Sequence, residues 1–177
     1  MKSFITLCIS IALMVTSIGM ALAASSADDQ RMNRRDIKAI RTLYREIETS
    51  IENGAMSKVN APAQCFREQS ALMEAYLTTD HTGTIRKLFV AYGTEDSLGS
   101  MAYYYDADGA HRFTFQSVGA VNGTQQERRI YFDKKGEEIH SDNRILAGPG
   151  YPTDIQGYVP QPEVYLTSLC NAGQSSD

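Results

Sequence analysis

The sequence predicts an α+β fold: an N-terminal amphipathic helix packed on a curved six-stranded antiparallel meander sheet, with a disulfide-tethered C-terminal segment. Three observations lead to this prediction. Apolar residues recur at helical spacing over residues 34–53, and over 70–145 short runs with a period of two alternate with turn residues. The stretch 147–177 is rich in Pro and Gly and follows neither period. We therefore expect a single α+β domain over residues 34–177.

Residues 1–23 have the features of a cleaved export signal. Lys2 supplies a positive charge, the run that follows is almost wholly apolar, and Ala21-Leu22-Ala23 matches the small-x-small cleavage pattern. A retained membrane-spanning helix is the alternative, because the apolar run is close to the length that a span needs. The polar residues that follow favour cleavage after Ala23. This leaves a periplasmic or secreted chain with no stable membrane insertion and a polar lead-in over residues 24–33.

Net charge limits the class of partner, and length limits the number of domains. The full chain has 17 basic and 21 acidic residues, a net charge of −4, and the loss of Lys2 makes the mature charge −5. A mildly acidic chain has no long-range attraction for nucleic acid, so we expect a protein or a small molecule as partner and no nucleic acid. Removal of 23 of the 177 residues leaves 154, a length that suits one domain.

The cysteines predict one disulfide. Cys8 leaves with the export signal, and Cys65 and Cys170 remain as a pair in an oxidising compartment. A redox-active pair is the alternative, but no Cys-x-x-Cys spacing is present to lower the pKa of one thiol. We expect the bridge to join the segment before the first predicted strand to the C-terminal tail.

The predicted helix over 34–53 has one apolar stripe and one charged face. Asn33 is expected to cap its N-terminus, and Asn53-Gly54 is expected to end it. The charged face is too weakly cationic for a helix that lies on a membrane, so we expect the stripe to cover one face of a sheet. The stripe consists of Ile37, Ile40, Leu43, Tyr44, Ile47 and Ile51.

Six short segments have the composition of strands. They are rich in β-branched and aromatic residues, and Gly, Asn or Asp stands between each pair, where the chain has to turn tightly. Because the segments follow one another closely, they predict a meander of antiparallel hairpins. The segments are 70–78, 84–92, 100–106, 111–118, 126–133 and 137–145.

Two of the turns share a sequence frame. Residues 104–109 and 131–136 both read aromatic, aromatic, Asp, any, any, Gly. Over these six residues the chain resembles the tyrosine-aspartate hairpin repeats of bacterial surface proteins. Two copies do not make an array, and a tight hairpin by itself needs Asp to accept turn amides and Gly to adopt a positive φ. The frame therefore predicts hairpins and assigns no family.

The tail over 147–177 is expected to leave the sheet. Gly148-Pro149-Gly150-Tyr151-Pro152 cannot form a central strand, since proline has no N–H for the ladder. We expect an ordered extended segment here. Pro162 is a suitable first residue for a short closing helix that ends near Leu169.

No motif predicts catalysis, a metal site or a cofactor. His81, His111 and His140 are each about 30 residues apart, unlike the convergent and often closely spaced ligands of a zinc site. We expect them to be solvated beside turns. No Gly-x-Ser-x-Gly elbow is present to hold a serine nucleophile.

Alternation along the strands predicts which side chains share a face. Phe113 and Phe115 are expected to face the helix, as are Ile130 and Phe132, with the intervening residues on the outer face. Arginine and tyrosine together are typical of recognition surfaces, although such a face can also be an ordinary solvated one. The predicted binding residues are Tyr104, Arg112, Arg129 and Tyr131 on the outer face, with Lys87 beside them, and Tyr151 in the tail.

These observations predict an exported, non-catalytic binding protein. It would act through recognition of a protein or an envelope glycan, and an inhibitor or immunity-type protein is one concrete form. Two alternatives stay open. One is an envelope enzyme whose site is assembled from scattered residues such as His111, Glu127 and Arg129, and the other is an envelope-assembly factor.

Overall fold

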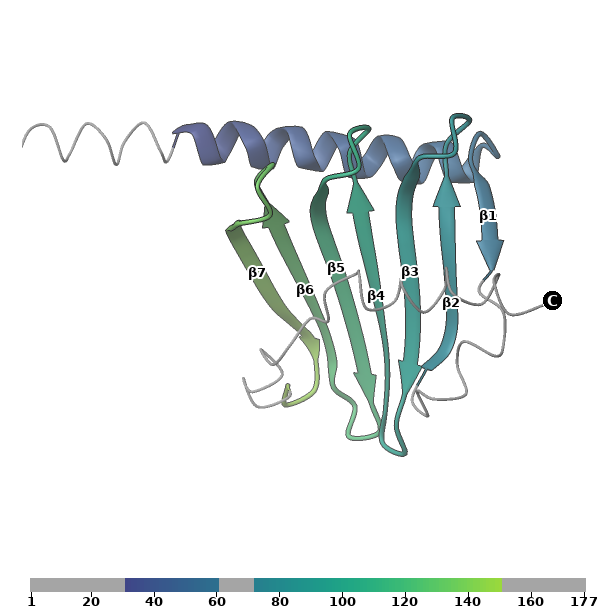
Figure 1. Cartoon of the computed structure of the whole chain (residues 1–177). Helices are drawn as coiled ribbons and strands as arrows, with labels where there is room; N and C mark the ends of the chain where they lie inside the picture. Colours follow the sequence, from purple (N-terminus) through teal and green to yellow (C-terminus); the bar gives the residue numbers. More distant parts are fainter. Residues whose placement is uncertain (1–30, 61–71, 151–177) are drawn as a thin grey trace, which may run out of the picture. The chain divides into compact units, whose positions relative to one another are not determined.

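A computed structural model describes residues 31–60 and 72–150 of the chain. The chain divides into two compact units, 1–39 and 40–177. In the first unit, residues 31–39 are helical. In the second, the helix continues through residue 52 and is followed by an antiparallel sheet (Figure 1). The expected export signal, Cys65, Cys170 and Tyr151 lie outside the described residues.

The sheet confirms the α+β class, but it has seven strands in the described residues, so the predicted count of six is wrong. Its order is β1-β2-β3-β4-β5-β6-β7, and every neighbouring pair is antiparallel, as expected of a meander. The six predicted segments all form strands. The bounds are β1 Ser57–Asn60, β2 Leu72–Thr79, β3 Ile85–Gly93, β4 Ser97–Tyr105, β5 His111–Ala120, β6 Gln125–Phe132 and β7 Glu138–Ala147.

The additional strand, β1, is short and fully exposed, which is why alternation in the sequence did not reveal it. It pairs with the end of β2, where Lys58 lies opposite Thr78. The Lys58 ammonium lies 3.7 Å from the centroid of the Tyr76 ring and 3.4 Å from Oε1 of Glu74. Strand pairing with β2 and these exposed side-chain contacts, rather than hydrophobic burial, join β1 to the sheet.

The helix ends where the sequence predicts. Gly54 has a φ of 71°, and the Ala55 and Gly54 amides donate to the carbonyls of Ser50 and Ile51 at 2.8 and 3.1 Å. This is the Schellman arrangement, in which glycine takes the left-handed position and the last carbonyls are satisfied. The predicted N-cap at Asn33 is wrong, because Arg31 is already helical. Within the described ranges, the helix contains no apolar stretch long enough to span a bilayer.

Three hairpins at one end of the sheet are built alike. Each begins with an aspartate whose Oδ1 accepts two backbone N–H groups, two and four residues further on, at 2.8 to 3.1 Å. Each also has a glycine with positive φ three residues after the aspartate. The aspartates are Asp80, Asp106 and Asp133. The turn at Asp80 does not match the aromatic, aromatic, Asp frame in the sequence, because threonines precede its aspartate.

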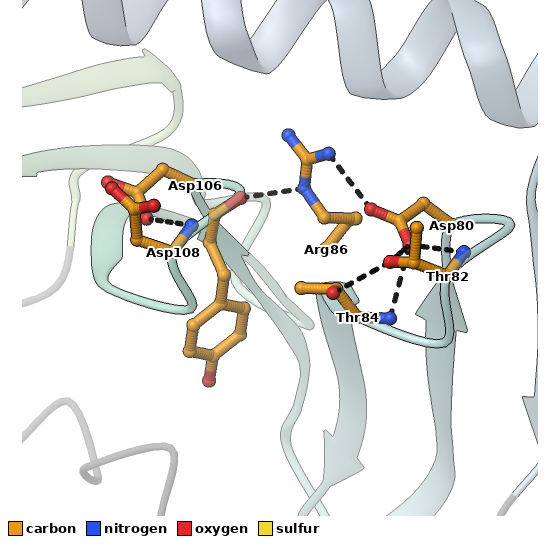
Figure 2. A network of polar contacts seen from close by, with 7 residues as sticks. Asp80, Thr82, Thr84, Arg86, Asp106 and Asp108 are labelled. Atoms are coloured by element: carbon orange, nitrogen blue, oxygen red, sulfur yellow. Dashed lines mark hydrogen bonds and ion pairs between the residues drawn. The ribbon is translucent and has the colours of Figure 1, made fainter.

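Two of these hairpins each contain an arginine that also bonds the next hairpin. Arg86 lies at a register shift on β3, donates from Nε to the carbonyl of Tyr105 at 3.2 Å and pairs with Asp80 at 3.2 Å (Figure 2). Arg112 repeats the pattern on β5, with the carbonyl of Phe132 at 3.1 Å and Asp106 at 3.3 Å. Each arginine therefore ties its own turn to the next hairpin along the sheet.

The helix segment 40–52 packs across the strands (Figure 1). Ile40 and Ile47 are buried, which confirms the centre of the predicted apolar stripe. The sheet residues beneath the helix form one cross-strand row, in which each residue lies directly opposite the next. The row runs Lys87, Tyr104, Phe113, Tyr131 and His140.

The opposite face of the sheet is also buried. Leu88, Val90, Met101, Tyr103 and Tyr105 form a cluster there and are at most 5% exposed, so over β3 and β4 this face is not a solvated surface.

Two further side chains on that face correct the predicted orientations. Tyr131 contacts the helix, and successive residues of a strand point to opposite faces, so Ile130 lies on the face away from the helix. Ile130 is buried there, and the prediction that it faces the helix is wrong. His111 is half-buried among aromatic rings and lies 2.8 Å from Oγ1 of Thr114, so it is not solvated.

We predict that Arg112→Ala lowers the free energy of unfolding by about 2 to 4 kcal/mol, because it removes a buried guanidinium and leaves the half-buried Asp106 carboxylate and the Phe132 carbonyl without their shared partner. Arg144→Ala is the control, since that arginine is 61% exposed and its pair with Asp142 should contribute about 0 to 1 kcal/mol. Urea unfolding at constant redox conditions measures both. Equal losses of unfolding free energy in the two variants would show that Arg112 does not brace the hairpins.

The first aspartate turn also predicts a loss of stability in acid. Hydrogen bonds from the Thr82 side chain first, and then from backbone amides and Arg86, lower the pKa of Asp80 to about 2. Its stabilising effect is therefore complete above about pH 4, the usual unfolded value, and declines as the pH falls towards 2. Urea midpoints between pH 5 and 2 should fall less steeply for Asp80→Asn than for the wild type. Asp108→Asn, at an exposed turn position, should follow the wild-type curve.

Candidate functional site

A cleft of about 520 Å³ lies between the helix and strands β5 to β7, within the second unit. Four aromatic rings line it, Tyr44 from the helix and Phe113, Phe115 and Tyr131 from the sheet. Four arginines contribute the charge: Arg41, Arg45, Arg129 and Arg144. We call these four side chains and the space they surround the arginine cleft.

Arg129 comes from β6, in the cross-strand row next to the one beneath the helix. Its Nη2 lies 2.6 Å from Oε2 of Glu127, and its guanidinium carbon lies 5.2 Å from the centroid of the Phe115 ring. Its Nη1 is buried and has no hydrogen-bond partner within residues 31–60 and 72–150. An unsatisfied guanidinium donor is costly, about 1 to 3 kcal/mol, and a ligand oxygen that reached it would remove that cost.

The ion pairs of the cleft form within single strands, not between neighbouring strands. Arg129 lies directly opposite Asp142, and Glu127 lies opposite Arg144. Each arginine nevertheless bonds the acid two residues away on its own strand, at 2.6 Å for Arg129 and 2.8 Å for Arg144. The four arginines of the cleft against Glu127 and Asp142 leave two net positive charges on a chain whose overall charge is −4.

The other two arginines come from the helix. Arg41 donates from Nε to the Tyr131 hydroxyl at 3.3 Å, with its guanidinium carbon 5.6 Å from the centre of that ring. Arg45 donates from Nε to the backbone carbonyl of Arg41 at 3.2 Å. Because they are four residues apart, both arginines lie on the same side of the helix. Their remaining N–H groups are able to bind a ligand.

A buried polar cluster fixes the helix over the sheet beside the cleft. Oε1 of Glu48 accepts from the Lys87 ammonium at 2.7 Å and from the Tyr104 hydroxyl at 2.9 Å. Burial and the adjacent Glu48 charge raise the pKa of Tyr104, so this hydroxyl stays protonated and remains a donor. Burial, with Glu48 as the next cause, also raises the pKa of Tyr44. Glu48, Lys87 and Tyr104 bond one another and hold the helix, whereas Tyr44 lines the cleft.

The structure separates the predicted binding residues. Arg129 and Tyr131 both line the arginine cleft, although Tyr131 is only 3% exposed. Tyr104, at 2% exposure, and Lys87 share their face of the sheet but lie beneath the helix, and Arg112 braces a hairpin, so these residues do not form an exposed outer surface.

Alternation failed at these positions for two reasons. It does not say which face a helix covers, and it takes no account of the β-bulge where Arg112 is the extra residue.

The other three arginines of the cleft, Arg41, Arg45 and Arg144, were not among the predicted binding residues. The helical spacing of Arg41 and Arg45 was a usable signal for those two, since residues four apart share a face. Arg144 had no such signal. It joins the cleft only because β7 pairs with β6 in the register that sets Asp142 opposite Arg129.

The scattered catalytic group considered from the sequence is not brought together. Glu127 and Arg129 are paired on the helix side of the sheet, whereas His111 contacts the rings of Tyr103 and Tyr105 on the opposite face. Over the two described stretches, no group of three or more His, Cys, Asp or Glu side chains is placed to hold a metal ion.

A second hollow, of about 560 Å³, lies at the opposite end of the sheet, between the β3–β4 and β5–β6 turns. Leu98 and Val121 are exposed there, and the Val121 amide donates to the Asp96 carbonyl at 3.0 Å. Its lining carries carboxylates and amides without a lysine or arginine. Of these two sites, the arginine cleft has the greater capacity to bind an anionic ligand.

The chain matches no known protein-family model, no curated protein and no solved structure. Its function is therefore inferred from the chemistry of the arginine cleft.

Proposed function

We propose that this protein is an exported, non-catalytic binding protein that recognises an anionic group on a protein or an envelope glycan through the arginine cleft. An inhibitor or immunity-type protein is one concrete form of this function. The proposed location, the periplasm or the exterior, rests on the export signal expected at residues 1–23.

The observation that carries the proposal is the convergence of four arginines from three elements, the helix, β6 and β7, with a positive balance, on a chain that is acidic overall. Guanidinium groups bind carboxylate, sulfate and phosphate oxygens through paired N–H donors, and the flat rings beside them suit a planar or sugar-like group. The volume of about 520 Å³ is within the range of ligand-binding clefts.

The same chemistry favours binding over catalysis. General acid–base catalysis needs a group that exchanges a proton near neutral pH. Arginine stays protonated, and the carboxylate in the cleft, Asp142, is held by Arg144 at 2.8 Å. Tyr44 has a raised pKa and keeps its proton. The cleft therefore offers fixed donors and positive charge, which are the features of a recognition site.

We predict that Arg129→Ala and Arg144→Ala each weaken partner binding at least about tenfold, the effect of losing one charge-assisted hydrogen bond. The mature chain, immobilised, captures proteins and glycans from an envelope extract, and the affinity of the captured species is then measured for each variant. Arg144 is largely exposed, so its variant should fold even if Arg129→Ala is destabilised.

The matched control is Lys58→Ala, which also removes one exposed positive charge. It lies on β1, five strand spacings or about 24 Å from β6, and should bind as the wild type does. An empty capture, or a partner that binds Arg144→Ala and folded Arg129→Ala with wild-type affinity, would contradict the proposal.

A further inference from the structure

The edge of the sheet beside the arginine cleft is open. Within the described residues, β7 pairs with β6 on one side and with no strand on the other. Every residue of β7 except Ile139 and Asp142 is exposed, including Ile145 and Leu146 at 56% each. An edge strand of this length presents a row of unpaired backbone N–H and C=O groups that can template another strand.

The two edges of the sheet differ. β1 has four residues and carries Lys58, and short, lysine-bearing edges resist strand addition. β7 has ten residues, and its central part is regular. Six consecutive pairs join β6 to β7 without a shift, from His140 opposite Tyr131 to Ile145 opposite Gln126, and a bulge or irregularity ends this run on each side. Residues 140–145 therefore form a regularly paired segment that is long enough to pair with an extended peptide.

This regular segment is also the segment that borders the cleft. Asp142 and Arg144 point to the cleft side, and the facing arginines come from β6 and the helix. A strand added outside β7 would place alternate side chains on that side, one strand spacing, about 4.8 Å, from Arg144. Because the cleft has two net positive charges, side chains with carboxylates fit it and side chains with ammonium groups do not.

We propose that β7 accepts an extended acidic segment of a partner protein as an added strand, whose backbone pairs with residues 140–145 and whose carboxylates bind Arg144 and the neighbouring arginines. This inference rests on the proposed function and specifies its partner. Main-chain hydrogen bonds supply affinity in such β-augmentation, and alternate side chains supply specificity.

The probe is an acetylated and amidated peptide of about eight residues in which threonine and glutamate alternate, so that its carboxylates share one face. We expect saturable binding to the mature chain by fluorescence anisotropy and slower hydrogen exchange of backbone amides within 140–145. Arg144→Ala and Arg129→Ala should each weaken binding at least about tenfold, whereas Lys58→Ala should not change it. The matched peptide with lysine in place of glutamate should not bind.

Two N-methylated peptides separate strand addition from side-chain binding. One is methylated on every threonine amide and the other on every glutamate amide, which blocks opposite edges of the extended probe. We expect one of them to lose binding and the other to keep it, because only one edge pairs with β7. Equal binding of both, with loss on Arg144→Ala, would overturn strand addition and leave the anion-binding function intact.

The remaining outcomes are equally decisive. No binding of the parent peptide would also overturn the inference, and the envelope capture would then test the proposed function separately. Binding that is indifferent to Arg144→Ala and to folded Arg129→Ala would count against the arginine cleft itself. Concentration-dependent dimerisation that protects residues 140–145 without peptide would identify a second copy of this chain as the occupant, which contradicts an acidic partner.

Discussion

The aspartate carboxylates of three hairpins are the constraint on which the rest of the sheet depends. Asp80, Asp106 and Asp133 each accept two amides of their own turn, and this fixes the residue at which each strand pair begins. Register in a hairpin follows from its turn, and a slip by one residue would move every side chain to the other face. Arg86 and Arg112 then tie each of the first two turns to the next hairpin, so the registers are set together.

The fixed registers create two cross-strand rows on one face. In the first, Lys87 and Tyr104 lie beneath the helix and bond Glu48, which holds the helix over the sheet. The second row brings Phe115, Arg129 and Asp142 side by side. It lies beside the helix and lines the cleft into which Arg41 and Arg45 project. The cleft is thus a consequence of how the helix is anchored.

The proposed binding site combines two different sources of binding free energy. Arginine side chains supply charge and specificity, while the open β7 edge supplies main-chain hydrogen bonds. An arginine-rich border also protects the edge. A long, apolar edge would invite pairing with any exposed strand, whereas the net positive charge of the cleft beside β7 favours an acidic partner.

The sequence by itself determined the helix end, the six main strands and their turns. Each of these depends on local chemistry, such as the positive φ of Gly54 or alternation along a short segment. It did not determine which face of the sheet the helix covers, because both faces carry aromatic side chains and Tyr103, Tyr104 and Tyr105 follow one another directly. Tertiary structure decided that choice through the Glu48 anchor, and strand pairing brought Arg144 to arginines that are 15 to about 100 residues away. Local patterns specify elements, but only register and packing specify a site assembled from several of them.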